Sequence, residues 1–245
     1  MGKYSHYDGH IEVLPVETLP EFDCHCHILP GLDDGAQTLD DSLYLAGRLA
    51  SCGFRRIACT SHSSFMYRNT PDTVIPVCEK LQEELGRNGI DLELTPSLEY
   101  QLIPETWPDQ RRRGLLPWEG NHVLIELPIR QRAQMGEINP VNEVRSLLEE
   151  GYQPVLAHPE RYLWATHDDY DRLHDAGCAF QRNLGSLEGS YGEETARRAE
   201  ALLRWGYYSF LGTDTHDRRY TDMLDRMMKE GKLRSQPPAV SFVEQ

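Results

Sequence analysis

The chain has 245 residues and a formal net charge of −14, with 39% hydrophobic and 26% charged residues. This length and composition suit one globular enzyme domain and exclude a disordered or fibrous protein. The negative charge repels nucleic-acid backbones, which argues against nucleic acid as the main partner. The N-terminal residues lack an apolar secretory segment, and no stretch approaches the ~18 apolar residues of a membrane span. We therefore expect a cytoplasmic protein.

A strand of alternating character begins at Phe22. Side chains of a strand alternate between its two faces, so His25 and His27 should project from one face. Cys24 and Cys26 should point the other way. Two imidazoles about 6–7 Å apart on one face can hold one metal ion.

A turn rich in carboxylates follows this strand. Pro30, Gly31 and Gly35 stop the strand, and the turn would bring Asp33 or Asp34 back toward the two imidazoles. Together, the histidine pair and the carboxylate turn indicate a metal site more strongly than a lone His-x-His does.

The rest of the chain alternates between predicted helices and strands. Helices are expected at residues 39–52, 71–85, 140–151, 168–176, 192–205 and 220–230, and further strands at 56–62, 91–99, 122–128, 153–158, 178–184 and 207–216. Residues 101–120 are expected to form the longest irregular stretch. We predict an N-terminal arm at 1–20, one domain at 21–231 and a loose tail at 232–245.

Helices that separate successive strands predict a parallel sheet. No Gly-x-Gly-x-x-Gly follows the first strand, which argues against a doubly wound sheet. We therefore predict a seven-stranded β/α barrel, whose functional groups should gather at the carboxyl ends of the strands.

Acidic or imidazole side chains stand at six of the predicted strand ends. Glu126 even lies in an apolar strand, where a carboxylate costs several kcal/mol unless it is paired or bound to metal. So many nitrogen and oxygen donors suit two or three divalent cations bridged by carboxylates, with Mn, Fe or Zn as candidates. The candidate ligands are His25, His27, Asp34, His62, Glu99, Glu126, His158, Asp214 and His216.

The cysteines and an arginine run complete the chemical inventory. The six cysteines are expected to be reduced and buried, and none is followed six positions later by arginine. The Cys-x5-Arg loop of cysteine-based phosphatases is therefore absent. The run at residues 111–113 is interpreted as a solvated face, with attraction of an anionic substrate or partner segment as the alternative.

These motifs resemble those of the PHP (polymerase and histidinol phosphatase) superfamily of metal-dependent phosphoesterases. Within it, the chain is most similar to bacterial protein-tyrosine phosphatases associated with capsule and exopolysaccharide synthesis. The matching segments are residues 23–35, 60–62, 98–100, 124–128, 157–162 and 213–216, in family order. The first and fifth are specific to the tyrosine-phosphatase branch. The second departs from the usual Thr-Pro-His-His, because Ser61 and Ser63 flank His62.

The resemblance implies a distorted (β/α)7 TIM-like barrel with up to three metals at the C-terminal ends of the strands. One metal would be held by His25, His27, Glu99 and Asp214; a second by Glu99, Glu126 and His158; a third by Asp34, His62 and His216. Manganese is the expected metal, with iron or zinc as alternatives. The implied reaction is hydrolysis of phosphotyrosine on proteins, such as a tyrosine kinase controlling polysaccharide synthesis, by attack of a metal-bridging hydroxide.

Three arginines are candidates for binding the phosphoryl group. Arg161 is expected to clamp it in bidentate fashion, the alternative being a surface ion pair with Glu160 or Asp169. The resemblance also implies a phosphate-binding arginine after the last motif, where Arg218 and Arg219 are both near enough. Alternative functions are a histidinol-phosphate or other small-molecule phosphatase, a phosphodiesterase or nuclease, and a non-catalytic scaffold that binds a kinase.

Overall fold

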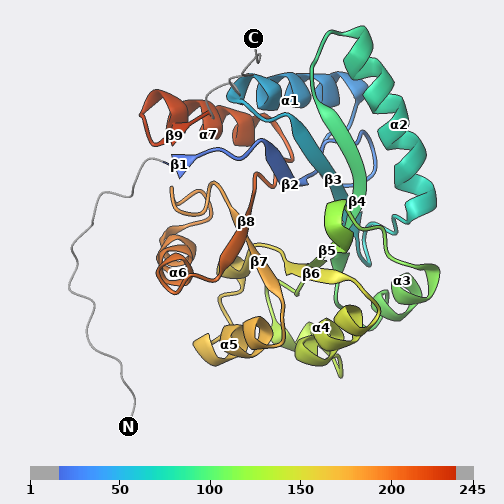
Figure 1. Cartoon of the computed structure of the whole chain (residues 1–245), viewed down its shortest axis with the longest axis vertical. Coiled ribbons are helices and arrows are strands. Elements are labelled where there is room, and N and C mark those ends of the chain that lie inside the picture. Colours follow the sequence, from blue (N-terminus) through green and yellow to red (C-terminus); the bar gives the residue numbers. More distant parts are fainter. Residues whose placement is uncertain (1–16, 236–245) are drawn as a thin grey trace, which may run out of the picture.

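The computed structural model describes residues 17–235, and seven parallel strands form its main sheet in the order β2-β3-β4-β5-β6-β7-β8. The strands curve round a central axis (Figure 1), and a bridge between Cys26 and Thr215 joins the two edges. The predicted seven-stranded barrel is confirmed. The strands are β2 (Phe22–Cys26), β3 (Arg56–Ser63), β4 (Glu93–Gln101), β5 (His122–Glu126), β6 (Gln153–Leu156), β7 (Ala179–Asn183) and β8 (Tyr208–Gly212).

Helices surround the sheet (Figure 1). They are α1 (Leu39–Cys52), α2 (Pro71–Arg87), α3 (Trp107–Arg113), α4 (Pro140–Glu149), α5 (His167–Asp175), α6 (Glu193–Arg204) and α7 (Arg218–Lys229), with short 3-10 turns at Glu119–Asn121, Arg132–Met135 and Pro159–Arg161. As predicted, Thr38 is the N-cap of α1, and its hydroxyl accepts from the Asp41 N–H in a capping box. Helix α1 ends at Gly53, which has φ 117°.

Helix α3 corrects the prediction that residues 101–120 are irregular. Its first residue, Trp107, is buried and donates its indole N–H to Glu143 at 2.8 Å. The arginine run lies on this helix, where Arg113 donates to Asp109 at 2.8 Å and Arg111 lies over the Trp107 ring. Helix α3 has only seven residues, too few turns to show an apolar period in the sequence, so tertiary packing determines that it forms.

Alternate strand residues divide the apolar core into two parts. On β5, Val123 and Ile125 belong to the large cluster that packs beneath the helices. Leu124 instead belongs to a small cluster with Ala58 and Val155, inside the barrel. This small inner cluster is apolar, whereas the side chains that follow it toward the carboxyl ends of the strands are polar. The barrel therefore opens at that end onto charged side chains.

A β-bulge in β2 corrects the predicted orientation of Cys24. Between its paired positions at Asp23 and Cys26, β2 advances three residues while β3 advances two. Strict alternation is therefore lost, and Cys24 joins the inner apolar cluster beside Ala58 on the same side as His25. Cys26 packs in the outer cluster, as predicted. All six cysteines are free and buried, which confirms that part of the prediction.

Residues from the predicted arm and tail pair with each other. Strand β1 (Glu17–Thr18) lies parallel to β9 (Leu233–Arg234) in a separate two-stranded sheet. The rest of the predicted arm and tail, residues 1–16 and 236–245, lies outside the described part. The division into arm, domain and tail stays a prediction. Within residues 17–235, no helix is long and apolar enough to cross a membrane.

Candidate metal centre

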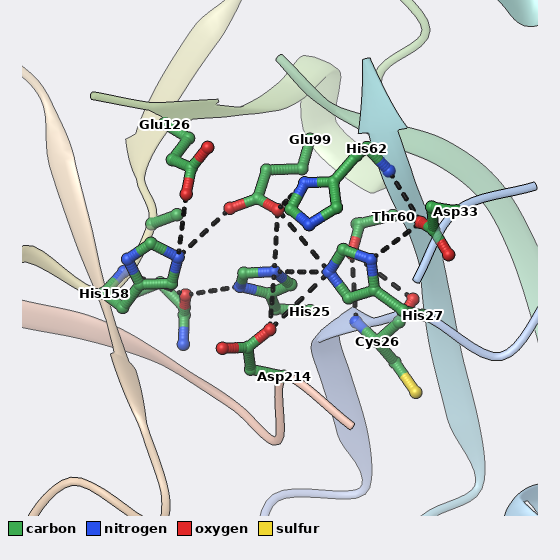
Figure 2. Close-up of polar contacts among 12 residues, drawn as sticks. His25, Cys26, His27, Asp33, Thr60, His62, Glu99, Glu126, His158 and Asp214 are labelled. Atoms are coloured by element: carbon green, nitrogen blue, oxygen red, sulfur yellow. Dashed lines mark hydrogen bonds and ion pairs between the residues drawn. The ribbon is translucent and has the colours of Figure 1, made fainter. Parts of the chain in front are cut away.

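All nine candidate ligands lie at the carboxyl end of the barrel. His25, His62, Glu99 and Glu126 stand on β2, β3, β4 and β5, at or near the last residue of each strand. The loops that follow β2, β6 and β8 supply the others, namely His27, Asp34, His158, Asp214 and His216. Figure 2 shows the side chains of His25, His27, His62, Glu99, Glu126, His158 and Asp214 converging on one region. The clustering expected from the parallel topology is present.

Glu99 lies at the middle of the cluster (Figure 2). Its Oε2 is 3.4 Å from Nε2 of His25, 3.5 Å from Nε2 of His27 and 2.9 Å from Nδ1 of His62. Its Oε1 is 3.2 Å from Nε2 of His158. Burial alone would raise the pKa of Glu99, but the neighbouring imidazoles hold it well below its usual range. The ionised carboxylate can therefore bridge cations on both sides.

The donor atoms form several overlapping sets. Within each set the ligand atoms lie within 4.8 Å of one another, and the sets are His25–Glu99–His158, His25–His27–Asp214, His62–Glu99–Glu126 and His27–His62–His216. Asp34 joins the last set through Oδ1, which is 3.4 Å from Nε2 of His62 and 3.6 Å from Nε2 of His216. Glu126 Oε1 is 3.7 Å from Nε2 of His158. This overlap suits several cations that share ligands.

The cluster fits divalent cations on the chemistry of its donors. Glu99 is 1% exposed, and neither of its carboxylate oxygens receives a well-aligned hydrogen bond from the described residues. Burial and the nearby Glu99 carboxylate raise the pKa of Glu126 to about 7. Burying the Glu99 and Glu126 carboxylates next to each other and next to imidazole lone pairs destabilises the protein unless a positive charge lies among them. Cations coordinated here would satisfy both the charge and the unpaired oxygens.

Asp33 and Asp34 both fold back toward the cluster, in different roles. Asp33 is 5% exposed, and its Oδ2 accepts from Nδ1 of His27 at 2.9 Å and from the N–H of His62 at 2.8 Å. This contact leaves Nε2 of His27 to face the other donors. The Asp34 side chain is 55% exposed and lies on the outer side of the cluster. The turn pattern predicts that either aspartate can fold back, and only Asp34 is among the candidate ligands; the role of Asp33 was missed.

Two candidate ligands have backbones in the left-handed region. His158 has φ 28° and Asp214 has φ 53°, which is uncommon for residues other than glycine. Asp214 follows β8, which ends at Gly212 rather than continuing to residue 216 as predicted. The Asp214 N–H donates to the carbonyl of His25 at 2.7 Å and holds the turn against β2. Strained backbone that is anchored in this way is typical of functional sites.

Arg161 enters the same region, and the alternative pairing predicted for it is wrong. Its Nη1 donates to Oδ2 of Asp214 at 3.0 Å, and its guanidinium lies 4.7 Å from the Tyr191 ring centroid. Glu160 is fully buried and accepts from the Ser186 hydroxyl. The Asp169 carboxylate accepts from the backbone N–H and the hydroxyl of Thr166 and pairs with Arg132. Neither is the partner of Arg161. The guanidinium instead stands at the edge of the donor cluster.

Arg218 and Arg219 lie farther out, at the start of α7. Arg218 stacks over the Tyr44 ring at 4.1 Å, and Arg219 donates to Oδ2 of Asp217 at 2.6 Å. Both line a pocket of about 690 Å³ that His216 also borders. Their role in binding phosphate stays a prediction.

Metal binding should release protons near neutral pH. In the metal-free protein, burial lowers the pKa of His62, but the Glu99 and Glu126 carboxylates together raise it to a net value of about 9. His62 must lose this proton to coordinate a cation, so metal affinity should rise with pH up to about 9. Calorimetric titration with Mn²⁺ in buffers of different ionisation enthalpy measures the released protons. Binding without proton release would contradict the assignment of His62 as a ligand.

Comparison with known families gives a match over most of the chain. The model for "Capsular polysaccharide synthesis, CpsB/CapC" matches residues 21–229. Tyrosine-protein phosphatase YwqE of Bacillus subtilis is 31% identical over 199 residues, covering 80% of this chain and 77% of that protein. Putative tyrosine-protein phosphatase CapC of Staphylococcus aureus is 24% identical, covering 86% of this chain and 89% of that protein.

Solved structures agree with this match. A crystal structure from a study of YwqE from Bacillus subtilis and CpsB from Streptococcus pneumoniae, described as unique metal-dependent tyrosine phosphatases, is 29% identical with a TM-score of 0.73. It covers 85% of this chain, and this chain covers 86% of it. Histidinol phosphate phosphatase from Lactococcus lactis is 11% identical with a TM-score of 0.52, covering 87% and 94% of the two chains. At that identity the likeness shows a shared barrel fold alone.

Proposed function

The chain belongs to the capsular polysaccharide synthesis CpsB/CapC family, and from this membership we propose that it is a metal-dependent phosphatase of phosphotyrosine on proteins. One observation carries the proposal: the buried Glu99 carboxylate faces four imidazole nitrogens at 2.9–3.5 Å. Such a set of oxygen and nitrogen donors, with an arginine at its edge, suits hydrolysis of a phosphate monoester.

We assign the cation ligands to the nine donors described above. One cation would be held by His25, His27, Asp214 and Glu99. Glu99 would also bind a second cation, together with Glu126 and His158. A third cation would be held by Asp34, His62 and His216. Two or three cations fit this number of donors, and Mn²⁺ is the proposed metal. Bound cations would supply an acidified water as the nucleophile and neutralise charge on the phosphoryl oxygens.

Arg161 is proposed to bind the phosphoryl group. Among the described residues its guanidinium donates through Nη1 to Asp214, so its other guanidinium N–H groups can reach phosphate oxygens. Stacking on the Tyr191 ring fixes the plane of the guanidinium. Arg218 or Arg219 would add a further contact to the phosphoryl group.

The leaving group of phosphotyrosine needs little help from the protein. A phenol has a pKa near 10, so the departing phenolate is a far better leaving group than an alkoxide. The buried acids of this site are assigned as cation ligands or, in the case of Asp33, as the partner of His27, which leaves none for a dedicated general acid. Aryl phosphates should therefore be preferred over alkyl phosphates. The physiological substrate would be a phosphotyrosyl protein, such as a bacterial tyrosine kinase.

Phosphate release from two substrates tests this proposal. We expect release from a phosphotyrosyl peptide with added Mn²⁺, loss of that activity on chelation, and little release from histidinol phosphate. Release from histidinol phosphate alone would keep the metal centre but overturn the substrate assignment. If neither substrate is hydrolysed while metal binds, the phosphodiesterase or scaffold alternative gains support.

A further inference from the structure

Strand β7 carries none of the candidate cation ligands, although it lies between β6 and β8 in the barrel. It contributes instead two amide side chains, Gln181 and Asn183, which are both fully buried. The two residues are two positions apart on one strand and so share a face. Buried amides need partners, and here the partners are candidate ligands, the Tyr191 hydroxyl and each other.

Three hydrogen bonds join these amides to the metal centre, and a fourth joins the amides to each other. Gln181 Oε1 accepts from Nδ1 of His25 at 2.9 Å and from the backbone N–H of His158 at 3.2 Å. Gln181 Nε2 donates to Oδ1 of Asn183 at 2.9 Å. Asn183 Nδ2 donates to Oδ2 of Asp214 at 2.7 Å. The result is one continuous chain from His25 to Asp214.

The direction of every bond in this chain is determined by its two ends. A backbone N–H can only donate, so the Gln181 atom that meets His158 must be the oxygen. An ionised carboxylate can only accept, so the Asn183 atom that meets Asp214 must be the nitrogen. Neither amide can therefore be flipped without breaking a bond.

This direction determines which nitrogen of His25 carries hydrogen. Because Gln181 presents an oxygen, Nδ1 of the neutral His25 ring must donate, and Nε2 keeps its lone pair. Nε2 lies 3.4 Å from Glu99 Oε2 and 3.4 Å from Asp214 Oδ1, where the donor atoms converge.

The same chain orients Asp214. Its Oδ2 accepts from Asn183, from Arg161 at 3.0 Å and from the Tyr191 hydroxyl at 3.2 Å. Three donors on one oxygen leave Oδ1 to face His25 and His27.

We propose that Gln181 and Asn183 are positioning residues that prepare His25 and Asp214 for a shared cation. The inference rests on the metal dependence in the proposed function but not on the identity of the phosphorylated substrate. Partners that orient metal ligands in this way typically change metal affinity 10- to 100-fold when they are lost.

Two substitutions of similar volume test the chain from its two ends. Gln181→Met removes the acceptor of His25, and Asn183→Leu removes the donor to Asp214. Gln82→Met is the matched control, because Gln82 also bonds at both amide atoms, to Leu92 and Leu94, but outside the barrel. Mn²⁺ affinity is measured by calorimetry on all four proteins. The tautomer of His25 is read from ¹⁵N NMR of the metal-free proteins at alkaline pH.

The two variants should differ in the tautomer but not in the direction of the affinity change. Both should bind Mn²⁺ about 10- to 100-fold more weakly than the wild type and the Gln82→Met control. Only Gln181→Met should lose the exclusive Nδ1–H form, because the His158 N–H still holds Gln181 in place in Asn183→Leu. Should Gln181→Met fail to fold, Asn183→Leu decides.

Wild-type affinity in folded variants, or an unchanged tautomer in folded Gln181→Met, would overturn the proposal. Neither readout uses a phosphorylated substrate. A wild type that binds Mn²⁺ but fails to hydrolyse phosphotyrosine would refute the proposed function while leaving this inference standing.

Discussion

Replacing Asp214 or His158 with alanine is expected to abolish phosphotyrosine hydrolysis without unfolding the protein. Each residue is assigned as a direct ligand, and its removal takes away several kcal/mol of charge stabilisation in the transition state. That loss corresponds to a decrease in kcat of about 10³-fold or more. Initial rates on a phosphotyrosyl peptide at saturating Mn²⁺ measure it.

Asp222→Ala serves as the control, because Asp222 is an exposed aspartate on α7 away from the donor cluster. It should keep wild-type activity. Circular dichroism and metal analysis separate loss of ligand from loss of fold. Full activity in folded Asp214→Ala or His158→Ala would remove that residue from the metal assignment.

Substitution of Arg161 should weaken phosphate binding more than it weakens metal binding. Arg161→Met removes the charge and the fork of donors, and two charge-assisted hydrogen bonds are together worth about 3–5 kcal/mol. We expect kcat/KM to fall about 10²- to 10³-fold, with much of the loss in KM. Inhibition by inorganic phosphate should weaken in parallel. Arg161→Lys should recover only part of the activity, because an ammonium cannot form the bidentate contact.

Arg132→Met is the matched control for this prediction. Arg132 also pairs with an aspartate and stacks on an aromatic ring, but its side chain is 55% exposed and its partner is Asp169 rather than a candidate ligand. Its loss should leave the kinetics nearly unchanged. Unaltered phosphate inhibition in folded Arg161→Met with normal metal content would rule out the clamp.

The Arg161 substitutions also probe the coupling between substrate and metal sites. Arg161 donates a hydrogen bond to Oδ2 of Asp214, and Asn183 and Tyr191 donate to the same oxygen. When the arginine is lost, Asn183 still donates to that oxygen and is itself held by Gln181, so Oδ1 should stay oriented toward the cations. Metal affinity should consequently change less in Arg161→Met than in Asn183→Leu, which removes the shortest of the three bonds.

Local patterns in the sequence were sufficient for most of the architecture. The capping box at Thr38 and the apolar spacing of α1 depend only on neighbouring residues, so the helix could be placed from the sequence. The alternation of helices and strands implied a parallel barrel, and parallel strands bring their carboxyl ends together. The convergence of the candidate ligands, from His25 to His216, could therefore be predicted from the sequence.

Only the tertiary structure decided how these residues are arranged. The bulge in β2 follows from the register with β3, so the side of the sheet that Cys24 faces could not be read from alternation. The hydrogen bond between His25 and Gln181 joins positions 156 residues apart. It exists because the barrel closes and places β7 beside the ligands. Sequence periodicity reports local geometry, whereas buried polar partners are chosen by packing across the whole fold.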